Sequence, residues 1–344
     1  MPQVLYRKYR PESFKEVLGQ DHVVDVLKKS ISLGNLSHAY LFSGSRGIGK
    51  TTVARIVAQE IGSTHNDVYE IDAASNRGID DIRELREAVD VLPFESKYKV
   101  YIIDEVHMLT KEAFNALLKT LEEPPEHVVF ILATTEIDKL PETIVSRCQT
   151  FNFKKPDQSL LEELVLKIAK KEGFSLDKAA ANLIGFLGDN SFRDAQGILQ
   201  KVIGSSKDKK ITVPEVEKIT GAPRNSLIND LVTSIDTSDL SKALSIVEKA
   251  NSQNIDMNIF LKLLLNKLRL ILLLRFSKDL SDDIQKEIGK DNFEFLNDVA
   301  LNTGGKIKAE VLNIFLQALE KQRFSHIQSL PIELALIEII GQNI

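Results

Sequence analysis

The stretch that decides the fold is Gly44-Ser45-Arg46-Gly47-Ile48-Gly49-Lys50-Thr51, which fits the pattern G-x-x-x-x-G-K-[ST] at every fixed position. In this pattern the glycines let backbone N–H groups surround phosphate oxygens, and the start of the next helix adds partial positive charge. The lysine reaches the β- and γ-phosphates, and the hydroxyl ligates Mg²⁺. We expect this loop and the adjoining Thr52 to hold a nucleoside triphosphate, with Lys50 on the phosphates and Thr51 on the metal.

The residues on either side of the loop supply the strand and the helix that such a site requires. Ala39–Phe42 is a short apolar strand, and residues 52–58 are apolar at positions 53, 56 and 57, which is a helical spacing. A chance glycine-rich turn is a much poorer explanation, because strand, loop and helix occur in the order that a phosphate site needs.

A second apolar strand ends in two acids. Residues 100–103 are continuously apolar, as in parallel strands covered on both faces, and Asp104 and Glu105 follow them. The carboxyl ends of parallel strands share one edge of the sheet, where ligands bind. We expect Asp104 to hold Mg²⁺ and Glu105 to orient and deprotonate the attacking water. A cap for the helix at residues 110–122 is the weaker alternative, because that helix starts several residues later.

The bulk numbers exclude several classes of protein. The 344 residues are enough for two or three domains, and a net charge of −5 gives no global signal for nucleic acid, although a local basic surface remains compatible. A single cysteine excludes an intramolecular disulfide framework and fits a reducing cytoplasm. The most apolar run, residues 259–276, contains four Lys or Arg, so we predict a buried helix and no membrane span.

The N-terminal arm, Tyr6–Pro11, is basic and aromatic. Such a segment on its own is most often a solvated basic edge with its aromatic rings tucked into a core. Ahead of a phosphate-binding loop it gains a second interpretation, because tyrosine and arginine faces can sandwich a purine base. We therefore expect Tyr9 and Arg10 to contact the nucleotide.

Six segments, spread over almost the whole of the first 150 residues, match the sequence pattern of one protein family. They are Tyr6–Pro11, His38–Gly44, Tyr69–Ser75, Asp104–Leu109, Leu117–Pro125 and Ser146–Cys148. Together they resemble the clamp-loader ATPases of the AAA+ superfamily, and within that group the gamma/tau family of bacterial DNA polymerase III. The resemblance implies ATP and Mg²⁺ as cofactors.

The resemblance also implies three further site residues. Thr134 ends the strand at residues 128–133 and is expected to be the first sensor, with Thr135 as its alternative. Arg147 is expected to be an arginine finger that acts in trans on a neighbouring subunit's nucleotide, although a lone arginine at a helix end is usually a dipole partner. Arg193 is expected to be the second sensor. An arginine in a first helical turn is disfavoured unless an anion compensates, either Asp194 or a phosphate.

The sequence departs from the family at two places. The family carries a four-cysteine zinc module after the phosphate-loop helix, whereas only Gly62–Asp67 bridges that gap here, so no zinc site is expected. The sequence ends at Ile344, and the long extension of the tau form is expected to be absent.

The resemblance and the helical patterns predict three domains. Residues 1–155 form an α/β P-loop AAA+ domain, with a parallel sheet covered by helices on both faces. Residues 156–221 form a small helical lid, and residues 222–344 an all-α collar. In the collar, Leu264, Leu268, Ile271 and Leu272 form an apolar stripe that serves either the bundle core or an intersubunit surface.

The resulting prediction is a cytoplasmic ATPase subunit of a clamp loader, which uses ATP to load a sliding clamp onto primer–template DNA. The expected partners are delta-like and delta-prime-like subunits, further gamma/tau copies, the clamp and the DNA. The charge-rich segment Ile79–Leu92 is a candidate contact for clamp or DNA, or simply a solvated face. The alternatives are a Holliday-junction type motor and a non-hydrolysing wall subunit of the same loader.

Overall fold

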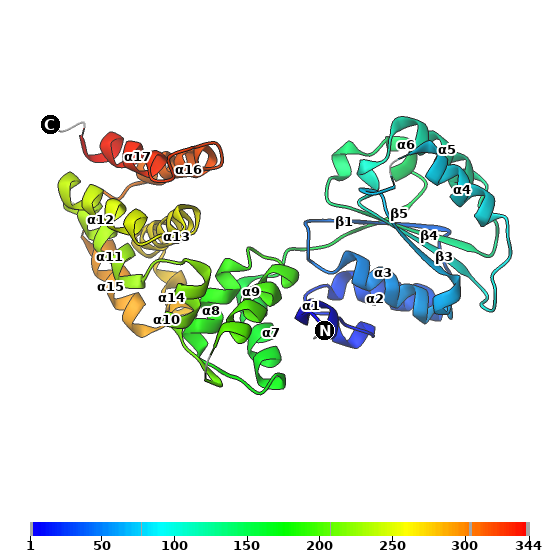
Figure 1. Ribbon diagram of the computed structural model, residues 1–344, viewed down its shortest axis with the longest axis horizontal. Helices are drawn as coiled ribbons and strands as arrows, with labels where there is room; N and C mark the ends of the chain where they lie inside the picture. The colour runs from blue at the N-terminus through cyan, green and yellow to red at the C-terminus, as the bar shows by residue number, and fades with distance from the viewer. Residues whose placement is uncertain (1–2, 77, 207, 303–304, 342–344) are drawn as a thin grey trace. The chain divides into compact units, whose positions relative to one another are not determined.

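Figure 1 shows the computed structural model, which describes residues 3–76, 78–206, 208–302 and 305–341. The chain forms two compact units. The first comprises Met1–Val165 with Gly188–Gly197, and the second comprises Leu166–Leu187 with Ile198–Ile344. The expected three domains stay a prediction.

A parallel sheet forms the centre of the first unit. Its strand order is β2-β3-β4-β1-β5, and every pairing is parallel. In this register Ser43 lies opposite Thr134 and Asp72 opposite Asp104, so the carboxyl ends of neighbouring strands are level. The strands are β1 (Ala39–Ser43), β2 (Val68–Asp72), β3 (Lys99–Asp104), β4 (Val128–Thr134) and β5 (Gln149–Asn152).

Helices cover both faces of this sheet, with α2 and α3 on one side and α4 to α6 on the other (Figure 1). Alternate residues of each strand enter different cores, as the period of two in a strand requires. In β3, Tyr101 and Ile103 pack with α4 and α5, whereas Val100 and Ile102 pack with α2 and α3. The predicted α/β class, with a parallel sheet between two helical layers, is confirmed.

The other elements from the N-terminus to the end of α9 are α-helices, 3₁₀ turns and one two-residue strand. The α-helices are α1 (Leu5–Lys8), α2 (Asp21–Ser32), α3 (Lys50–Glu60), α4 (Ile79–Val89), α5 (Lys111–Glu122), α6 (Glu142–Val145), α7 (Gln158–Lys171), α8 (Lys178–Leu187) and α9 (Phe192–Ser205). The 3₁₀ turns are η1 (Phe14–Glu16), η2 (His65–Asp67), η3 (Val106–Met108) and η4 (Ile137–Lys139), and the strand is β6 (Ser175–Leu176).

The rest of the second unit is helical apart from β7, which pairs with β6. Its elements are β7 (Lys210–Ile211), α10 (Val213–Thr220), α11 (Asn225–Asp236), α12 (Leu240–Ser252), α13 (Met257–Phe276), η5 (Lys278–Leu280), α14 (Ser281–Ile288), α15 (Lys290–Leu301), α16 (Ala309–Gln322) and α17 (Leu330–Ile340). Helix α10 starts as the sequence predicts, because the Glu215 carboxylate accepts the Thr212 N–H at 2.9 Å, and it ends at Gly221 with φ 72°.

Helix α13 is the centre of the C-terminal core. Leu264, Leu268 and Ile271 are fully buried there, and Leu272 is partly buried against the same cluster. This confirms a buried helix where the sequence is most apolar, and the intersubunit role of the stripe stays a prediction. Among the described residues, no helix is both long and apolar enough to cross a membrane.

One buried carboxylate organises the short connection that follows α3. Asp67 is fully buried, and it accepts N–H groups of Phe94 at 2.6 Å, Glu95 at 3.0 Å and Ser96 at 2.8 Å. Burial raises its pKa, but these amides and the Ser96 hydroxyl outweigh that effect and lower the pKa from 3.8 to about 2. The loop before β3 is therefore held by an ionised side chain.

We predict that Asp67→Asn lowers the free energy of unfolding at pH 7 by about 1–3 kcal/mol, because three amides lose a charged acceptor. The folded pKa lies below the unfolded value, so the contribution is complete above about pH 4 and is lost as the pH falls through about 2. Urea unfolding of wild type and variant should therefore show that the difference in the free energy of unfolding becomes smaller as the pH falls from 7 to 3. The exposed Asp80→Asn serves as control, with a change within about 0.5 kcal/mol. An Asp67→Asn protein as stable as wild type at pH 7 would contradict this.

Candidate active site

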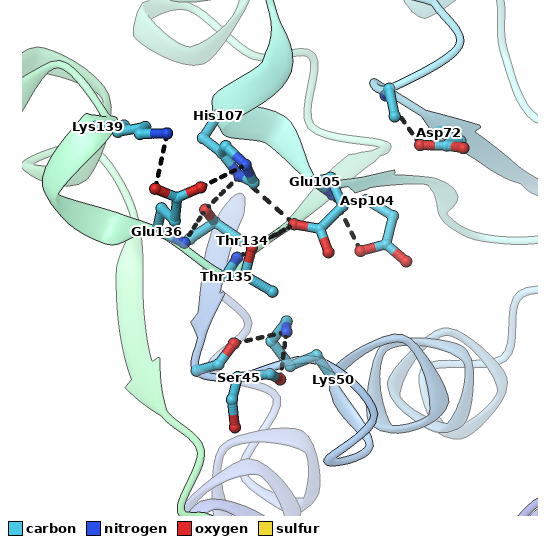
Figure 2. A network of polar contacts seen from close by, with 12 residues as sticks. Ser45, Lys50, Asp72, Asp104, Glu105, His107, Thr134, Thr135, Glu136 and Lys139 are labelled. Atoms are coloured by element: carbon cyan, nitrogen blue, oxygen red, sulfur yellow. Dashed lines mark hydrogen bonds and ion pairs between the residues drawn. The ribbon is translucent and has the colours of Figure 1, made fainter. Parts of the chain in front are cut away.

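The phosphate-binding loop joins the end of β1 to the start of α3. Gly44, Gly47 and Gly49 have φ of 141°, 74° and 106°, a region that glycine enters without a steric penalty. The Lys50 side chain is buried, and its ammonium donates to the carbonyl oxygens of Gly44 at 2.7 Å and Ser45 at 2.9 Å (Figure 2). Ile48 is buried against the sheet, whereas Arg46 is exposed.

Several groups act on the Lys50 ammonium. Burial lowers its pKa most, Glu105 and Asp104 act in the opposite direction, and Arg193 lowers it further. The lysine, the two acids and Arg193 are therefore close enough to interact electrostatically, and their roles in one site stay a prediction.

The start of α9 lies against this loop within the same unit. The Arg193 N–H donates to the Gly47 carbonyl at 3.4 Å, and a Cβ at Gly47 would clash with the Ser191 hydroxyl. Asp189 and Asn190 turn the chain here in the left-handed region, which Asp and Asn adopt more readily than other non-glycine residues. Arg193 is thus next to the phosphate loop, and its role as second sensor stays a prediction.

Arginines of the N-terminal arm gather near Arg193. The Arg193 guanidinium lies 5.7 Å from the Tyr6 ring centre. Burial lowers the pKa of Arg10 most, followed by the charge of Arg55, and Arg193 and Arg7 act in the same direction while Glu70 opposes them. This concentration of positive charge favours a polyanion such as a triphosphate. Lys8 Nζ lies 5.4 Å from the Tyr9 ring centre. Contact of Tyr9 and Arg10 with a base stays a prediction.

Thr51 and Asp104 lie together, as expected for a metal site. The Thr51 hydroxyl donates to Asp104 Oδ2 at 2.7 Å, and Asp104 Oδ1 accepts the Glu105 N–H at 3.0 Å. A carboxylate and a hydroxyl oxygen on adjoining elements are a donor set that fits Mg²⁺. The neighbouring Asp72 is used differently, because its carboxylate accepts the Ala74 N–H at 2.9 Å in a turn.

Glu105 leaves β3 in an unusual backbone conformation. Its φ is 49°, which is uncommon for a side-chain-bearing residue and clusters at functional sites. Its Oε2 accepts the Thr135 N–H at 3.2 Å and the Thr135 hydroxyl at 2.9 Å, and His107 Nδ1 lies 3.4 Å from the same oxygen (Figure 2). The carboxylate is therefore oriented by three groups.

The two threonines at the end of β4 have different partners. Thr134 is fully buried, and its hydroxyl oxygen lies 3.0 Å from His107 Nδ1 and accepts the Glu136 N–H at 3.0 Å. Thr135 contacts Glu105 directly. Among the described residues, His107 contacts both Thr134 and Glu105. Which threonine acts as first sensor stays a prediction.

Arg147 follows α6 and contacts residues of α5 and α6. Its guanidinium donates to the Thr143 carbonyl of α6 at 2.8 Å and pairs with the Glu122 carboxylate at the end of α5 at 2.6 Å. This position agrees with a residue that does not serve its own site, and the role in trans stays a prediction.

An open cavity of about 620 Å³ lies beside the loop, at the carboxyl ends of β1, β4 and β5. Its size is within the range of small-molecule sites, about 300–1,000 Å³. Its lining includes Ser43, Ser45, Thr135, Lys139 and Asn152.

Sequence reasoning missed three residues at or near this site. His107 stands three positions after Asp104, and a histidine so soon after an acidic strand end is a signal that could have been used. Arg55 follows Lys50 by five residues and pairs with Glu70 at 2.8 Å, and Glu122 binds Arg147. The partners of Arg55 and Glu122 are distant in sequence, so only the fold reveals those two pairs.

Sequence comparisons find a consistent set of relatives. The family model described as "DNA polymerase III, delta subunit" matches residues 19–76 and 61–157. A "DNA polymerase III subunit tau" of Bacillus subtilis is 36% identical over 98% of this chain and 63% of its own length. A gamma/tau subunit of Mycoplasma genitalium is 40% identical, covering 76% and 47%, and the tau subunit of Escherichia coli is 37% identical, covering 80% and 46%. The chain thus spans between 46% and 63% of these three relatives.

A comparison with solved structures identifies the fold. Thermotoga maritima RuvB, described as a Holliday junction branch migration motor, matches with a TM-score of 0.54 and 20% identity, over 66% of this chain and 79% of that one. A likeness at this identity shows a shared fold and nothing further.

We predict that Gly47→Ala weakens nucleotide binding by about tenfold or more, because the new methyl group meets Ser191 and disturbs the loop that holds phosphate. Gly62→Ala is the matched control, since Gly62 also has a positive φ, 86°, but faces open space. Backbone strain should lower the free energy of unfolding of each variant by about 1 kcal/mol. Only Gly47→Ala should bind a fluorescent ATP analogue more weakly. Equal affinities for the two variants would refute the role assigned to this contact.

Proposed function

We propose that this chain, which belongs to the gamma/tau family of DNA polymerase III subunits, hydrolyses ATP to load a sliding clamp onto primer–template DNA. The observation that carries the ATPase part is the meeting of Lys50, the Thr51–Asp104 pair and Glu105 at the phosphate loop. The relatives' names support the clamp-loading part.

In this proposal the phosphate loop and Lys50 bind the triphosphate. Backbone N–H groups of the loop and the start of α3 surround phosphate oxygens, and the Lys50 ammonium exchanges its carbonyl partners for phosphate. Thr51 and Asp104 would hold Mg²⁺, which neutralises charge on the phosphates when bound. Arg193, beside Gly47, would report whether a γ-phosphate is present.

Glu105 is the proposed base for water. Its Oε2 is occupied by Thr135 and His107, so the other carboxylate oxygen is the one that takes the proton from the attacking water. Because these contacts fix the carboxylate, little reorganisation is needed when the reaction begins.

Arg147 is proposed to complete the site of a neighbouring subunit. A guanidinium aimed at the γ-phosphate stabilises developing charge and can raise the rate by about 10³–10⁵. Its pairing with Glu122 and the Thr143 carbonyl would keep it extended along α6 until a neighbour docks. Delta-like and delta-prime-like subunits and further copies of this family are the proposed neighbours.

The two alternatives have less support. A branch-migration motor rests only on fold likeness at 20% identity, whereas the relatives at 36–40% identity bear gamma/tau names. A non-hydrolysing wall subunit would not need the complete set Lys50, Thr51, Asp104 and Glu105, and this chain has all four.

Primer–template DNA is the proposed nucleic-acid partner. Its phosphates would meet local basic surface, because the net charge of −5 offers no general attraction. The helix α4 carries basic side chains such as Arg83 among acids, with Arg83 paired to Asp80 at 3.0 Å, and stays a candidate contact for DNA or clamp.

We predict that Lys50→Ala abolishes measurable ATP hydrolysis and weakens ATP binding, because no other side chain replaces the buried ammonium at the phosphates. The exposed Lys29→Ala on α2 is the control and should behave as wild type. Steady-state phosphate release and binding of a fluorescent ATP analogue are the measurements. Hydrolysis that persists in Lys50→Ala would refute the ATP site.

We predict that Arg147→Ala leaves ATP affinity of the isolated chain within about twofold of wild type but lowers hydrolysis in the assembled loader by about 10³. Glu122→Gln keeps the guanidinium and should cost less than tenfold. Loss of ATP binding by isolated Arg147→Ala would show that the arginine acts on its own subunit's nucleotide.

A further inference from the structure

We propose that His107 is a positioning residue of the hydrolysis reaction, which joins the buried Thr134 hydroxyl to the Glu105 carboxylate. The inference rests on the proposed ATPase function. It concerns a residue to which the sequence analysis assigns no role.

The backbone explains why His107 reaches this place. Glu105 turns the chain in the left-handed region, and the Met108 N–H donates to the Glu105 carbonyl at 2.8 Å in the turn η3. Val106 is fully buried in the core between the sheet and α4 and α5, which anchors the turn. His107 is thereby directed back over the end of β4, where Figure 2 shows its ring beside Thr134 and facing Glu105.

Oxygen atoms of neighbouring residues lie beside both ring nitrogens. Nδ1 lies 3.0 Å from the Thr134 hydroxyl oxygen and 3.4 Å from Glu105 Oε2, and Nε2 lies 3.4 Å from Glu136 Oε1. The side chain is 5% exposed, so water does not compete freely for these contacts. Glu136 is itself paired with Lys139 at 2.7 Å, which fixes the outer side of the ring.

The partners of Nδ1 explain how the ring couples two parts of the site. A hydrogen on Nδ1 can be shared between the Thr134 oxygen and Glu105 Oε2, because both are acceptors. The Thr134 oxygen then accepts from His107 and from the Glu136 N–H, and its own hydrogen remains available. A change at the end of β4 therefore moves the ring, and the ring moves the carboxylate.

Thr135 alone does not provide this link. It fixes Glu105 Oε2 from the loop that follows β4, through its N–H and its hydroxyl. His107 approaches the same oxygen from the turn that follows β3, so the carboxylate is held between the two strand ends. Holding a base in its productive geometry is worth much of its effect, since a misplacement of about 1 Å can cost about 100-fold.

Two substitutions separate the two ring nitrogens. His107→Asn places an amide near the position of Nδ1, and His107→Gln places one near that of Nε2. We expect His107→Gln to lower kcat for ATP about 10- to 100-fold, and His107→Asn to lose less than about fivefold. The dissociation constant for ATP should stay within about twofold in both, because the contacts described for the ring are with Thr134, Glu105 and Glu136 and not with the phosphate loop. His127→Gln is the matched control, since His127 contacts the Val89 carbonyl away from the site.

Thr134→Val tests the same link from its other end, because it replaces the hydroxyl with a methyl group of similar size. It should lower kcat about as much as His107→Gln, and the double variant should be no worse than the poorer single variant, because both remove one connection. Additive losses would overturn the proposal. Equal kcat values for His107→Gln, His107→Asn and wild type would also overturn it, as would a loss of ATP binding that parallels the loss of kcat.

Failure of the underlying function would look different. If the wild-type chain hydrolysed no ATP with its partners, and Lys50→Ala bound ATP as well as wild type, the ATPase assignment itself would fall. If wild type is active and Lys50→Ala is not, a normal kcat in His107→Gln overturns only the role of His107.

Discussion

The hydrogen bond from the Thr51 hydroxyl to the Asp104 carboxylate, at 2.7 Å, joins helix α3, which follows the phosphate loop, to the end of strand β3. It depends on the parallel register of the sheet, in which the carboxyl ends of β1, β3 and β4 lie level. Each strand therefore delivers its next polar residue to the same edge: the loop after β1, the acids after β3 and the threonines after β4. The other contacts of the site depend on this alignment of the strand ends.

Most of the fold could be predicted from sequence, because it follows from local pattern. The phosphate loop, the apolar strands that end in Asp104 or Thr134, and the buried helix α13 all carry their signal in adjacent residues. The Thr212–Glu215 cap and Gly221 are equally local. Thr51 and Asp104 could be predicted to lie together only because the order of strands in phosphate-binding folds is known.

The remaining site contacts depend on tertiary neighbours and could not be predicted in the same way. Nothing adjacent to Glu105 requires its left-handed backbone, yet that turn places His107 over β4. The Arg147–Glu122 pair joins residues 25 positions apart. Asp67 is a further case: where the family resemblance implies a zinc module, three backbone amides around one carboxylate hold the neighbouring loop.

Arg147 follows α6 and contacts Glu122 and the Thr143 carbonyl, and its proposed role in trans gives the proposed function its most specific consequence. We propose that this chain supplies the base, the metal ligands and the lysine of one site, and that assembly with a neighbouring subunit completes that site. The most direct measurement is ATP turnover by this chain assembled with delta-like and delta-prime-like partners, with clamp and primed DNA or with primed DNA alone. We expect full stimulation only when the clamp is present, and equal stimulation by DNA alone would contradict the proposed function.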